Sequence, residues 1–312
     1  MEDYPLITIG ILSYNRPGDL RQAILSVINQ TYSNLEILIS DNGSFIEETK
    51  DVIREFAEKD KRIQFFFHDI NRGPLFNFGF LLDNARGKYF AWLADDDYFT
   101  SHFVADCVGY FSSGKGIVLS SNMPVESGTG KTITMKYIPN TTSLKKMEKY
   151  KLVVRHIFSD LNLFYYGLIE TSSLKKCRFY LKKVFGADVL LLLELLKFGD
   201  FFINTQKTGL VYQIHINQTS NSPSQYKKVS CINGSFIERK LFFSASFFYS
   251  IRIVAGYKQV SFLSRLNLIR MIIYHYIKSK RFHLIKYDLG VNGIIQYFKS
   301  VFFKKNISKA AE

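Results

Sequence analysis

The sequence predicts an α/β fold in which a mainly parallel sheet is flanked by helices. Three observations lead to this fold class. Short runs rich in Ile, Leu, Phe and Tyr alternate with helical patterns between residues 6 and 94. Polar segments follow the strand-like runs, and 47% of the 312 residues are apolar, which is enough to bury a core. Strand and helix in regular alternation favour a parallel sheet covered on both faces.

Four strands and three helices are predicted in the first third of the chain. The strand-like runs are rich in β-branched and aromatic residues and end at polar turns; they cover residues 6–13, 35–40, 62–68 and 88–94. The helical segments have apolar residues at helical spacing; they cover residues 17–30, 46–60 and 74–86. Each helix connects two strands, as a parallel sheet requires.

The pattern is less regular from residue 112 to about residue 230. Strands are predicted at 116–122, 131–138 and 208–215, and helices at 101–111, 143–158 and 186–199. We interpret these segments as the second half of one domain, residues 1–230. From residue 231 the sequence becomes aromatic, basic and compatible with helices, which predicts a separate C-terminal helical extension, residues 231–312.

The net charge of +14 is concentrated in that extension, where residues 231–312 carry 14 Lys and Arg against three Asp and Glu. Such a segment, also rich in Phe and Tyr, suits either nucleic acid or an anionic membrane surface. No signal peptide and no apolar run of about 18 residues is found, so we expect no membrane crossing. Three widely spaced cysteines favour a reducing, cytoplasmic setting.

Three of the predicted strands end in polar segments that could form one site. These segments are "SYNRPGD" (13–19), "SDNGS" (40–44) and "DDDYF" (95–99). In open α/β sheets, ligands bind in the crevice beyond the carboxyl ends of the strands. The strand ends are therefore the expected position of a functional site.

The carboxylates at two of these ends have chemical uses and simpler alternatives. Three adjacent aspartates, Asp95 to Asp97, repel one another, and Mg²⁺ or Mn²⁺ would relieve that repulsion. The alternative is a solvated acidic turn at the start of the next helix. Asp41 could accept hydrogen bonds from a ribose or a base, or it could simply stabilise an Asx turn.

Taken together, the motifs resemble a known family. "ITIGILSYNRPGDLRQAILSVINQTYSNLEILISDNGS", "NRG" at 71–73 and "ARGKYFAWLADDDYF" follow one another over about 105 residues. This order and spacing resemble the inverting glycosyltransferases of family 2, which have the Rossmann-like GT-A fold. There are two departures: Asn42 replaces the second aspartate of "DDGS", and Ala94 replaces the first aspartate of "LDxDD".

The resemblance implies roles for residues in the first half, which would be the nucleotide-sugar half, about 1–110. Tyr14 would line the base pocket, Asp41 would bind the base or its ribose, and Arg72 would lie near the nucleotide. Asp95 would bind the ribose and Asp96 the metal, with Asp97 as a support or an alternative metal ligand. A core position for Tyr14 and a surface position for Arg72 are the alternatives.

In the second half, the acceptor half of about 111–230, the resemblance points to Asp188 and His215. Asp188 opens the apolar helix predicted at 186–199, where Asp can cap the helix; in the family this aspartate takes the proton of the acceptor hydroxyl. His215 ends the strand "YQIH" and could complete the metal shell, or it could be structural. Gln213 stands where an arginine is common.

The expected activity is single displacement from a nucleotide-diphosphate sugar, with a UDP-sugar favoured, assisted by Mg²⁺ or Mn²⁺. The expected acceptor is a glycan, including lipid-linked oligosaccharides of polysaccharide, O-antigen or capsule synthesis, reached from the inner face of the cell membrane. The basic extension could instead be a helical subdomain packed on the core. A catalytically silent membrane-bound scaffold and a nucleotidyltransferase remain alternatives, whereas no nucleic-acid-binding signature is found.

Overall fold

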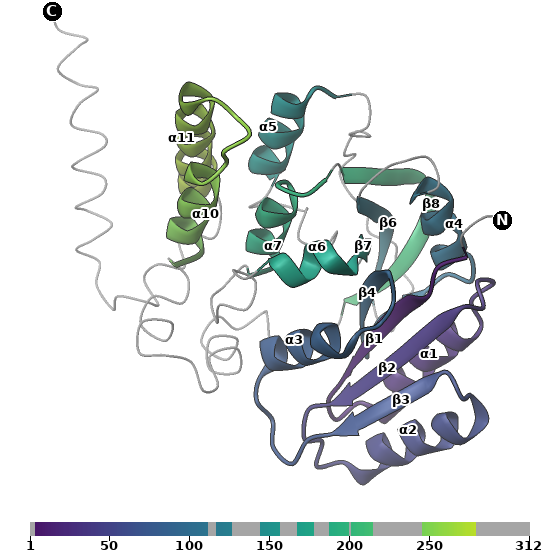
Figure 1. Cartoon of the computed structure of the whole chain (residues 1–312). Helices are drawn as coiled ribbons and strands as arrows, with labels where there is room; N and C mark the ends of the chain where they lie inside the picture. Colours follow the sequence, from purple (N-terminus) through teal and green to yellow (C-terminus); the bar gives the residue numbers. More distant parts are fainter. Residues whose placement is uncertain are drawn as a thin grey trace, which may run out of the picture.

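An eight-stranded sheet forms the centre of the computed structural model, which describes residues 4–111, 117–126, 144–156, 167–177, 187–199, 201–214 and 245–278 (Figure 1). The strand order is β3-β2-β1-β4-β7-β6-β8-β5. The four strands predicted first are neighbours and all parallel: β1 (Ile7–Ser13), β2 (Leu35–Asp41), β3 (Ile63–Phe67) and β4 (Tyr89–Ala94). The predicted parallel sheet is therefore confirmed.

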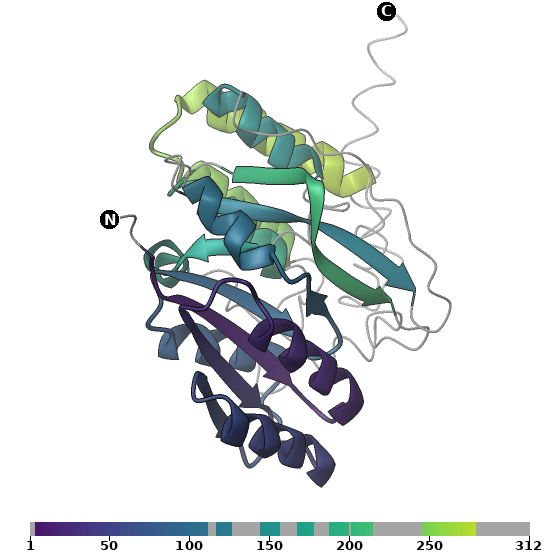
Figure 2. The ribbon, with the colours of Figure 1, turned by 90° about the vertical axis from the view of Figure 1, so that its right-hand side faces the viewer.

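Helices cover both faces of this parallel part. The three connecting helices are α1 (Pro17–Ile28), α2 (Glu47–Lys59) and α3 (Pro74–Asn84). α1 and α2 lie side by side on one face, and α3 lies on the other (Figures 1 and 2). Leu20, Ile24 and Val27 of α1 are fully buried, as their helical spacing predicts. All three strands β1, β2 and β4 are buried along most of their length, as expected for a sheet covered on both faces.

The second half of the sheet is mixed. Its strands are β5 (Tyr98–Phe99), β6 (Ile117–Glu126), β7 (Leu168–Glu170) and β8 (Phe201–Ile214). β7 is antiparallel to both β4 and β6, while β6 and β8 are parallel. β8 begins at Phe201, seven residues before the prediction, and the strand predicted at 131–138 lies outside the described residues.

The remaining helices of the described chain belong to the second half and to the C-terminal extension. They are α4 (Phe103–Phe111), α5 (Lys146–His156), α6 (Thr171–Lys176), α7 (Ala187–Leu195), α10 (Ala245–Ala255) and α11 (Phe262–Lys278). α10 packs on α7, and α11 packs on α5 (Figures 1 and 2). Among the described residues, no helix is long and apolar enough to cross a membrane.

Two tyrosines join the extension to the second half. Tyr257, which follows α10, is fully buried and its hydroxyl donates to the Leu193 carbonyl at 2.7 Å. Its ring stacks on Tyr150 of α5, with ring centroids 5.0 Å apart. Burial of two aromatic rings with satisfied hydroxyls is strongly stabilising. Residues 245–278 therefore pack against the second half of the chain.

Glu36 lies on β2, within the first of the segments that resemble family 2, and has a structural role. It is buried, and its carboxylate accepts hydrogen bonds from the Thr8 hydroxyl at 2.6 Å and the Arg86 backbone N–H at 2.9 Å. Burial favours the neutral carboxyl, but the bonds from Thr8 and Arg86 outweigh it and lower the pKa of Glu36. The ionised Glu36 thus fixes the turn that leads into β4.

Candidate active site

The three polar strand ends lie at the same edge of the sheet. Ser13 at the end of β1 is in register with Asp41 at the end of β2, and Leu12 is in register with Ala94 at the end of β4. The segments that follow these strands are therefore neighbours in space. This arrangement agrees with the site position expected from the sequence.

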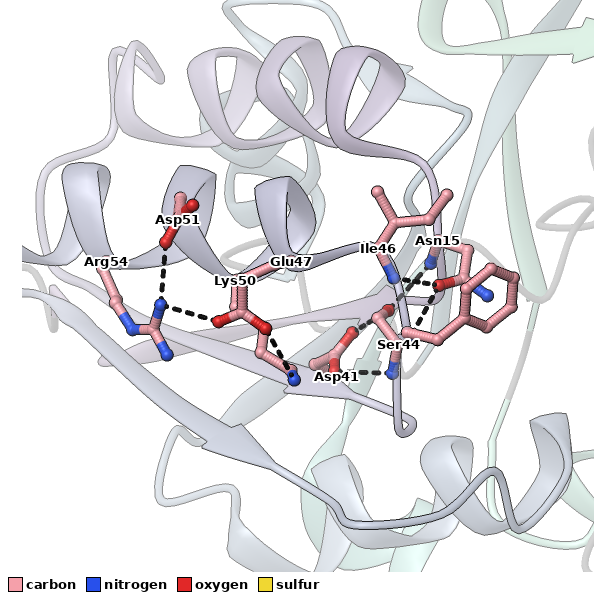
Figure 3. A network of polar contacts seen from close by, with 9 residues as sticks. Asn15, Asp41, Ser44, Ile46, Glu47, Lys50, Asp51 and Arg54 are labelled. Atoms are coloured by element: carbon pink, nitrogen blue, oxygen red, sulfur yellow. Dashed lines mark hydrogen bonds and ion pairs between the residues drawn. The ribbon is translucent and has the colours of Figure 1, made fainter.

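Asn15 holds the first of these segments against the second (Figure 3). Its φ angle is 57°, a left-handed conformation that Asn tolerates better than most residues. Its backbone N–H donates to the Ser44 hydroxyl at 2.8 Å. Its side-chain oxygen accepts from the backbone N–H groups of Phe45 at 2.9 Å and Ile46 at 3.1 Å. One short polar side chain thus organises two loops and the entry to α2.

Asp41 is fully buried, and its carboxylate is held within its own turn (Figure 3). The backbone N–H of Ser44 donates to one carboxylate oxygen at 3.0 Å, and the Ser44 hydroxyl donates to the other. The Ser13 hydroxyl also donates to Asp41, at 3.4 Å. These bonds are the turn geometry that "DNGS" favours. A contact between Asp41 and a base stays a prediction.

Asn42 joins this turn to the "NRG" turn of residues 71–73. Its side-chain NH₂ donates to the Asn71 side-chain oxygen at 3.0 Å and to the Gly73 carbonyl at 3.1 Å. Its own side-chain oxygen accepts from the Arg72 backbone N–H at 3.1 Å. An ionised aspartate could not make the two donations, because it only accepts hydrogen bonds. The departure from "DDGS" therefore has a structural function in this chain.

Two exposed aromatic rings stand beside these turns. The Tyr14 ring is 38% exposed and packs edge-on against Phe45, which is 80% exposed; their centroids are 6.4 Å apart. Exposed aromatic faces suit a flat nucleobase. Arg72 is exposed, and its guanidinium lies 4.8 Å from the centroid of the Phe76 ring. Tyr14 is thus not a core aromatic, and Arg72 is at the surface next to the same edge.

Asp95 and Asp96 share one cationic partner, Arg16. The same terminal nitrogen of Arg16, Nη1, donates to Asp95 Oδ1 at 3.1 Å and to Asp96 Oδ2 at 2.5 Å. The other oxygen of Asp95 accepts from the Tyr14 backbone N–H at 2.8 Å. Burial raises the pKa of Asp95 to about 7, although Arg16 opposes this rise. A positive charge between Asp95 and Asp96 is therefore strongly favoured, because it stabilises the ionised carboxylates.

Asp97 makes its hydrogen bond to a different part of the chain. Its Oδ1 accepts from the Gln213 backbone N–H of β8 at 2.9 Å, so it joins the two halves of the sheet. Its Oδ2 is buried and has no hydrogen-bond partner in the described part of the chain. Burial, with Asp96 as the next contribution, raises the pKa of Asp97 well above its ordinary value. Three consecutive aspartates thus occupy two different environments.

The donor set near Arg16 fits a hard divalent cation. Asp95 and Asp96 each direct an oxygen toward one point, and Mg²⁺ in nucleotide sites commonly takes only one or two carboxylates, with phosphates and waters as its other ligands. Within the described ranges, no group of three or more His, Cys, Asp or Glu side chains could hold a metal. His215 lies outside the described residues.

Asp188 is the second residue of α7, so the sequence prediction that it opens this helix is confirmed. A position in the first turn favours an ionised carboxylate, because the helix N-terminus carries partial positive charge. The leucines that follow, from Leu190 to Leu193, are buried in the core. They fix α7, and with it the backbone of Asp188.

Comparison with known proteins decides the family. The family model described as "Glycosyl transferase family 2" matches residues 8–169, which is just over half of the chain and contains every strand end described above. The chain belongs to glycosyltransferase family 2. It is therefore a transferase, as the motifs indicated.

Relatives of this glycosyltransferase include bacterial proteins of similar length. An uncharacterised glycosyltransferase of Haemophilus influenzae is 26% identical over 254 residues, covering 79% of this chain and 94% of the relative. The GalNAc(5)-diNAcBac-PP-undecaprenol beta-1,3-glucosyltransferase of Campylobacter jejuni is 25% identical over 212 residues. That match covers 67% of this chain and 65% of the relative.

Solved structures confirm the GT-A fold. The crystal structure of S. aureus TarS 1-349 in complex with UDP has a TM-score of 0.68 at 11% identity and covers 95% of this glycosyltransferase and 78% of that chain. The complex with UDP-GlcNAc has a TM-score of 0.66 at 12% identity, with coverages of 88% and 73%. At these identities the likeness concerns the fold.

Three residues of the site were not singled out from the sequence: Arg16, Asn15 and Ser44. A signal for Arg16 was available, because a basic residue in the loop after a strand should find the carboxylates at the neighbouring strand ends. Asn15 and Ser44 belong to short polar loops, and Asn and Ser commonly bond to nearby backbone groups. Which groups they reach depends on strand register, which only the structure supplies.

Proposed function

We propose that this glycosyltransferase transfers a sugar, with inversion, from a nucleotide-diphosphate sugar to a hydroxyl of a glycan acceptor. The observation that carries the proposal is the meeting of Tyr14, Asp41, Asp95 and Asp96 at one sheet edge. An aromatic surface for a base and carboxylates for a ribose and a cation are the groups that a nucleotide-diphosphate sugar requires.

A UDP-sugar is the favoured donor. The exposed rings of Tyr14 and Phe45 would receive the base, and Arg72 borders the same edge. Support comes from TarS, which shares the fold and was crystallised with UDP and with UDP-GlcNAc. A contact of Asp41 with the base would require its carboxylate to exchange a bond from Ser44 or Ser13 for one from the ligand.

Asp95 and Asp96 would hold Mg²⁺ or Mn²⁺, with Asp97 as a support from the β8 side and His215 as a further candidate ligand. When bound, the cation would neutralise the negative charge of the leaving diphosphate. Burial of Asp95 and Asp97 makes unneutralised carboxylates costly, which favours the presence of a cation.

Asp188 would act as the general base. It accepts the proton of the acceptor hydroxyl while that oxygen forms a bond to the anomeric carbon and the bond to the diphosphate breaks on the opposite side. Attack from the side opposite the leaving group inverts the anomeric configuration. The position of Asp188 in the first turn of α7 supports this role, because the partial positive charge of a helix N-terminus favours a carboxylate there.

A lipid-linked oligosaccharide is the proposed acceptor, reached from the cytoplasmic face of the membrane in polysaccharide, O-antigen or capsule synthesis. The undecaprenol-linked substrate in the name of the C. jejuni relative supports it. Helix α11 contains no Asp or Glu and exposes Phe262, Leu263, Leu266 and Tyr274 together with Arg270. Exposed apolar and basic side chains on one helix suit an anionic membrane surface.

Membrane binding predicts a specific loss on changing α11. The double variant Leu263→Glu/Leu266→Glu should bind vesicles containing phosphatidylglycerol about tenfold or more weakly than the wild type, because it removes apolar area and adds charge. Flotation measures the bound fraction, and Leu25→Glu, on the exposed side of α1, is the control. Equal flotation of both variants and the wild type would remove α11 from membrane binding.

Donor binding is tested by thermal shift with UDP, UDP-GlcNAc, UDP-glucose, GDP-mannose and dTDP-glucose, each with Mn²⁺ or with EDTA. A donor at about 100 times its Kd should stabilise the fold by about 2.7 kcal/mol. We expect the largest thermal shift with a UDP compound and Mn²⁺. On longer incubation, slow hydrolysis of the UDP-sugar should release UDP. The absence of any nucleotide-dependent shift would contradict the proposal.

The reaction products distinguish the two alternatives. A catalytically silent scaffold, suggested by Ala94 and Gln213, would bind a donor but release no UDP. A nucleotidyltransferase would produce pyrophosphate from a nucleoside triphosphate and a sugar phosphate instead. That activity needs a Gly-rich phosphate loop after the first strand, where this chain has "SYNRPGD".

A further inference from the structure

We propose that Arg16 is an exchangeable counter-ion: its guanidinium neutralises Asp95 and Asp96 in the empty enzyme and moves to the diphosphate when cation and donor bind. The inference rests on the proposed function, because it requires a cation at Asp95 and Asp96. It assigns a positioning role to a residue outside the predicted base, ribose and metal contacts.

The first step is the position of the Arg16 guanidinium. One of its nitrogens bonds to an oxygen of Asp95 and to an oxygen of Asp96, at 3.1 and 2.5 Å. These are the two oxygens that converge on a common point, so a divalent cation that uses both must take the place of this nitrogen. Two cations cannot share that position, and binding of one must release the other.

The second step is that Arg16 can leave without disturbing the site. Its side chain is 41% exposed, whereas those of Asp95 and Asp96 are 10% and 14% exposed. Its backbone is anchored, because its carbonyl accepts the Leu20 N–H at 3.0 Å in the first turn of α1. Asp95 keeps its bond from the Tyr14 N–H. Rotation of the Arg16 side chain alone therefore removes its nitrogen from Asp95 Oδ1 and Asp96 Oδ2.

The third step is the destination of the released group. The anchored backbone keeps the guanidinium within the length of one side chain of the sheet edge where β1 and β4 end. A planar guanidinium binds phosphate oxygens through two parallel hydrogen bonds. The diphosphate, which arrives with the cation, is therefore the new partner of Arg16. Without a donor, the cation binds weakly because it must displace Arg16. When the donor is present, its diphosphate binds the displaced guanidinium and makes cation binding stronger.

The test begins with Mn²⁺ in the absence of nucleotide, with free Mn²⁺ measured by electron paramagnetic resonance. Arg16→Gln should bind Mn²⁺ about tenfold more tightly than the wild type, because the competing charge-assisted bonds are gone. Arg16→Lys, which keeps the charge but loses the planar fork, should fall between them. Arg21→Gln is the control: Arg21 is similarly exposed and bonds to Glu55 at 2.7 Å.

The second measurement uses UDP and uridine with saturating Mn²⁺. Arg16→Gln should bind UDP about tenfold more weakly than the wild type and should bind uridine equally well, because uridine has no phosphate. Tighter Mn²⁺ binding with weaker UDP binding is a pattern that a merely structural role would not produce. If Arg16→Gln does not fold, Arg16→Lys is compared with the wild type instead. The inference then requires Arg16→Lys to bind Mn²⁺ more tightly and UDP more weakly than the wild type.

Two negative outcomes have different meanings. Equal or weaker Mn²⁺ binding by both Arg16 variants would overturn this inference and leave the proposed function standing. If neither the wild type nor any variant binds Mn²⁺, and wild-type UDP release continues in EDTA, then the cation part of the proposed function is wrong. The inference fails with it in that case.

Discussion

Asp188→Asn should lower the rate of UDP release by about 10²- to 10⁴-fold, the usual contribution of a general base. Asparagine keeps the size of the side chain and can still cap a helix, so α7 should remain in place. It cannot accept a proton from an attacking hydroxyl. The rate is measured as UDP release from the best donor of the thermal-shift screen, with water as acceptor, and UDP affinity by calorimetry.

The separation of rate from affinity is the important result for Asp188. We expect the Kd for UDP to change less than twofold, because Asp188 lies on α7, whereas the residues proposed to bind the nucleotide follow the ends of β1, β2 and β4. Glu48→Gln is the control, since it also removes a carboxylate from the first turn of a helix, α2. Near-wild-type turnover of Asp188→Asn would exclude Asp188 as the base.

The positions of the site loops could be predicted from sequence, but the directions of their side chains could not. The strands end at Ser13, Asp41 and Ala94, within one residue of the predicted ends, because apolar runs followed by polar turns determine such boundaries well. A parallel sheet then brings those ends together. Side-chain direction within a short turn depends on local backbone geometry, which composition does not encode.

The aspartates show this limit most clearly. Asp95 and Asp96 face Arg16, whereas the next residue, Asp97, accepts a bond from β8, more than 100 positions away in the sequence. Three consecutive carboxylates indicated a cation site. The sequence does not tell which of them contact Arg16 and which contacts β8. The contact from Gln213 comes from its backbone N–H, which any residue except proline would supply, so the identity of the side chain does not predict it.

Asn42 illustrates a departure from a family pattern that the structure explains. The sequence shows only that an amide replaces a carboxylate of similar size. In the structure its NH₂ group bonds to Asn71 and Gly73, and thereby ties the "DNGS" turn to the "NRG" turn. The two turns act as one unit, which includes Asp41 and Arg72. Substitutions that separate the two turns should therefore weaken nucleotide binding, even at residues that do not contact the nucleotide.

Gly43→Ala should destabilise the protein by about 2–4 kcal/mol and weaken UDP binding by tenfold or more. Gly43 has a φ angle of 75°, and a Cβ atom there would lie 2.5 Å from the Ile70 carbonyl carbon and 2.7 Å from the Asn71 nitrogen. Both atoms belong to backbone, so the "NRG" turn would have to move away from Asn42. Urea unfolding and calorimetry with UDP measure the two effects.

Gly18→Ala provides the matched control for this prediction. Gly18 lies in the first turn of α1, and a Cβ atom there would meet nothing within 4 Å. Alanine should therefore be neutral or stabilise the helix by up to about 1 kcal/mol. If Gly43→Ala lost stability but kept full UDP affinity, the coupling of the two turns to nucleotide binding would be wrong. If it lost neither, the close approach of residues 43 and 70 would itself be wrong, because alanine cannot occupy that space without displacing the backbone.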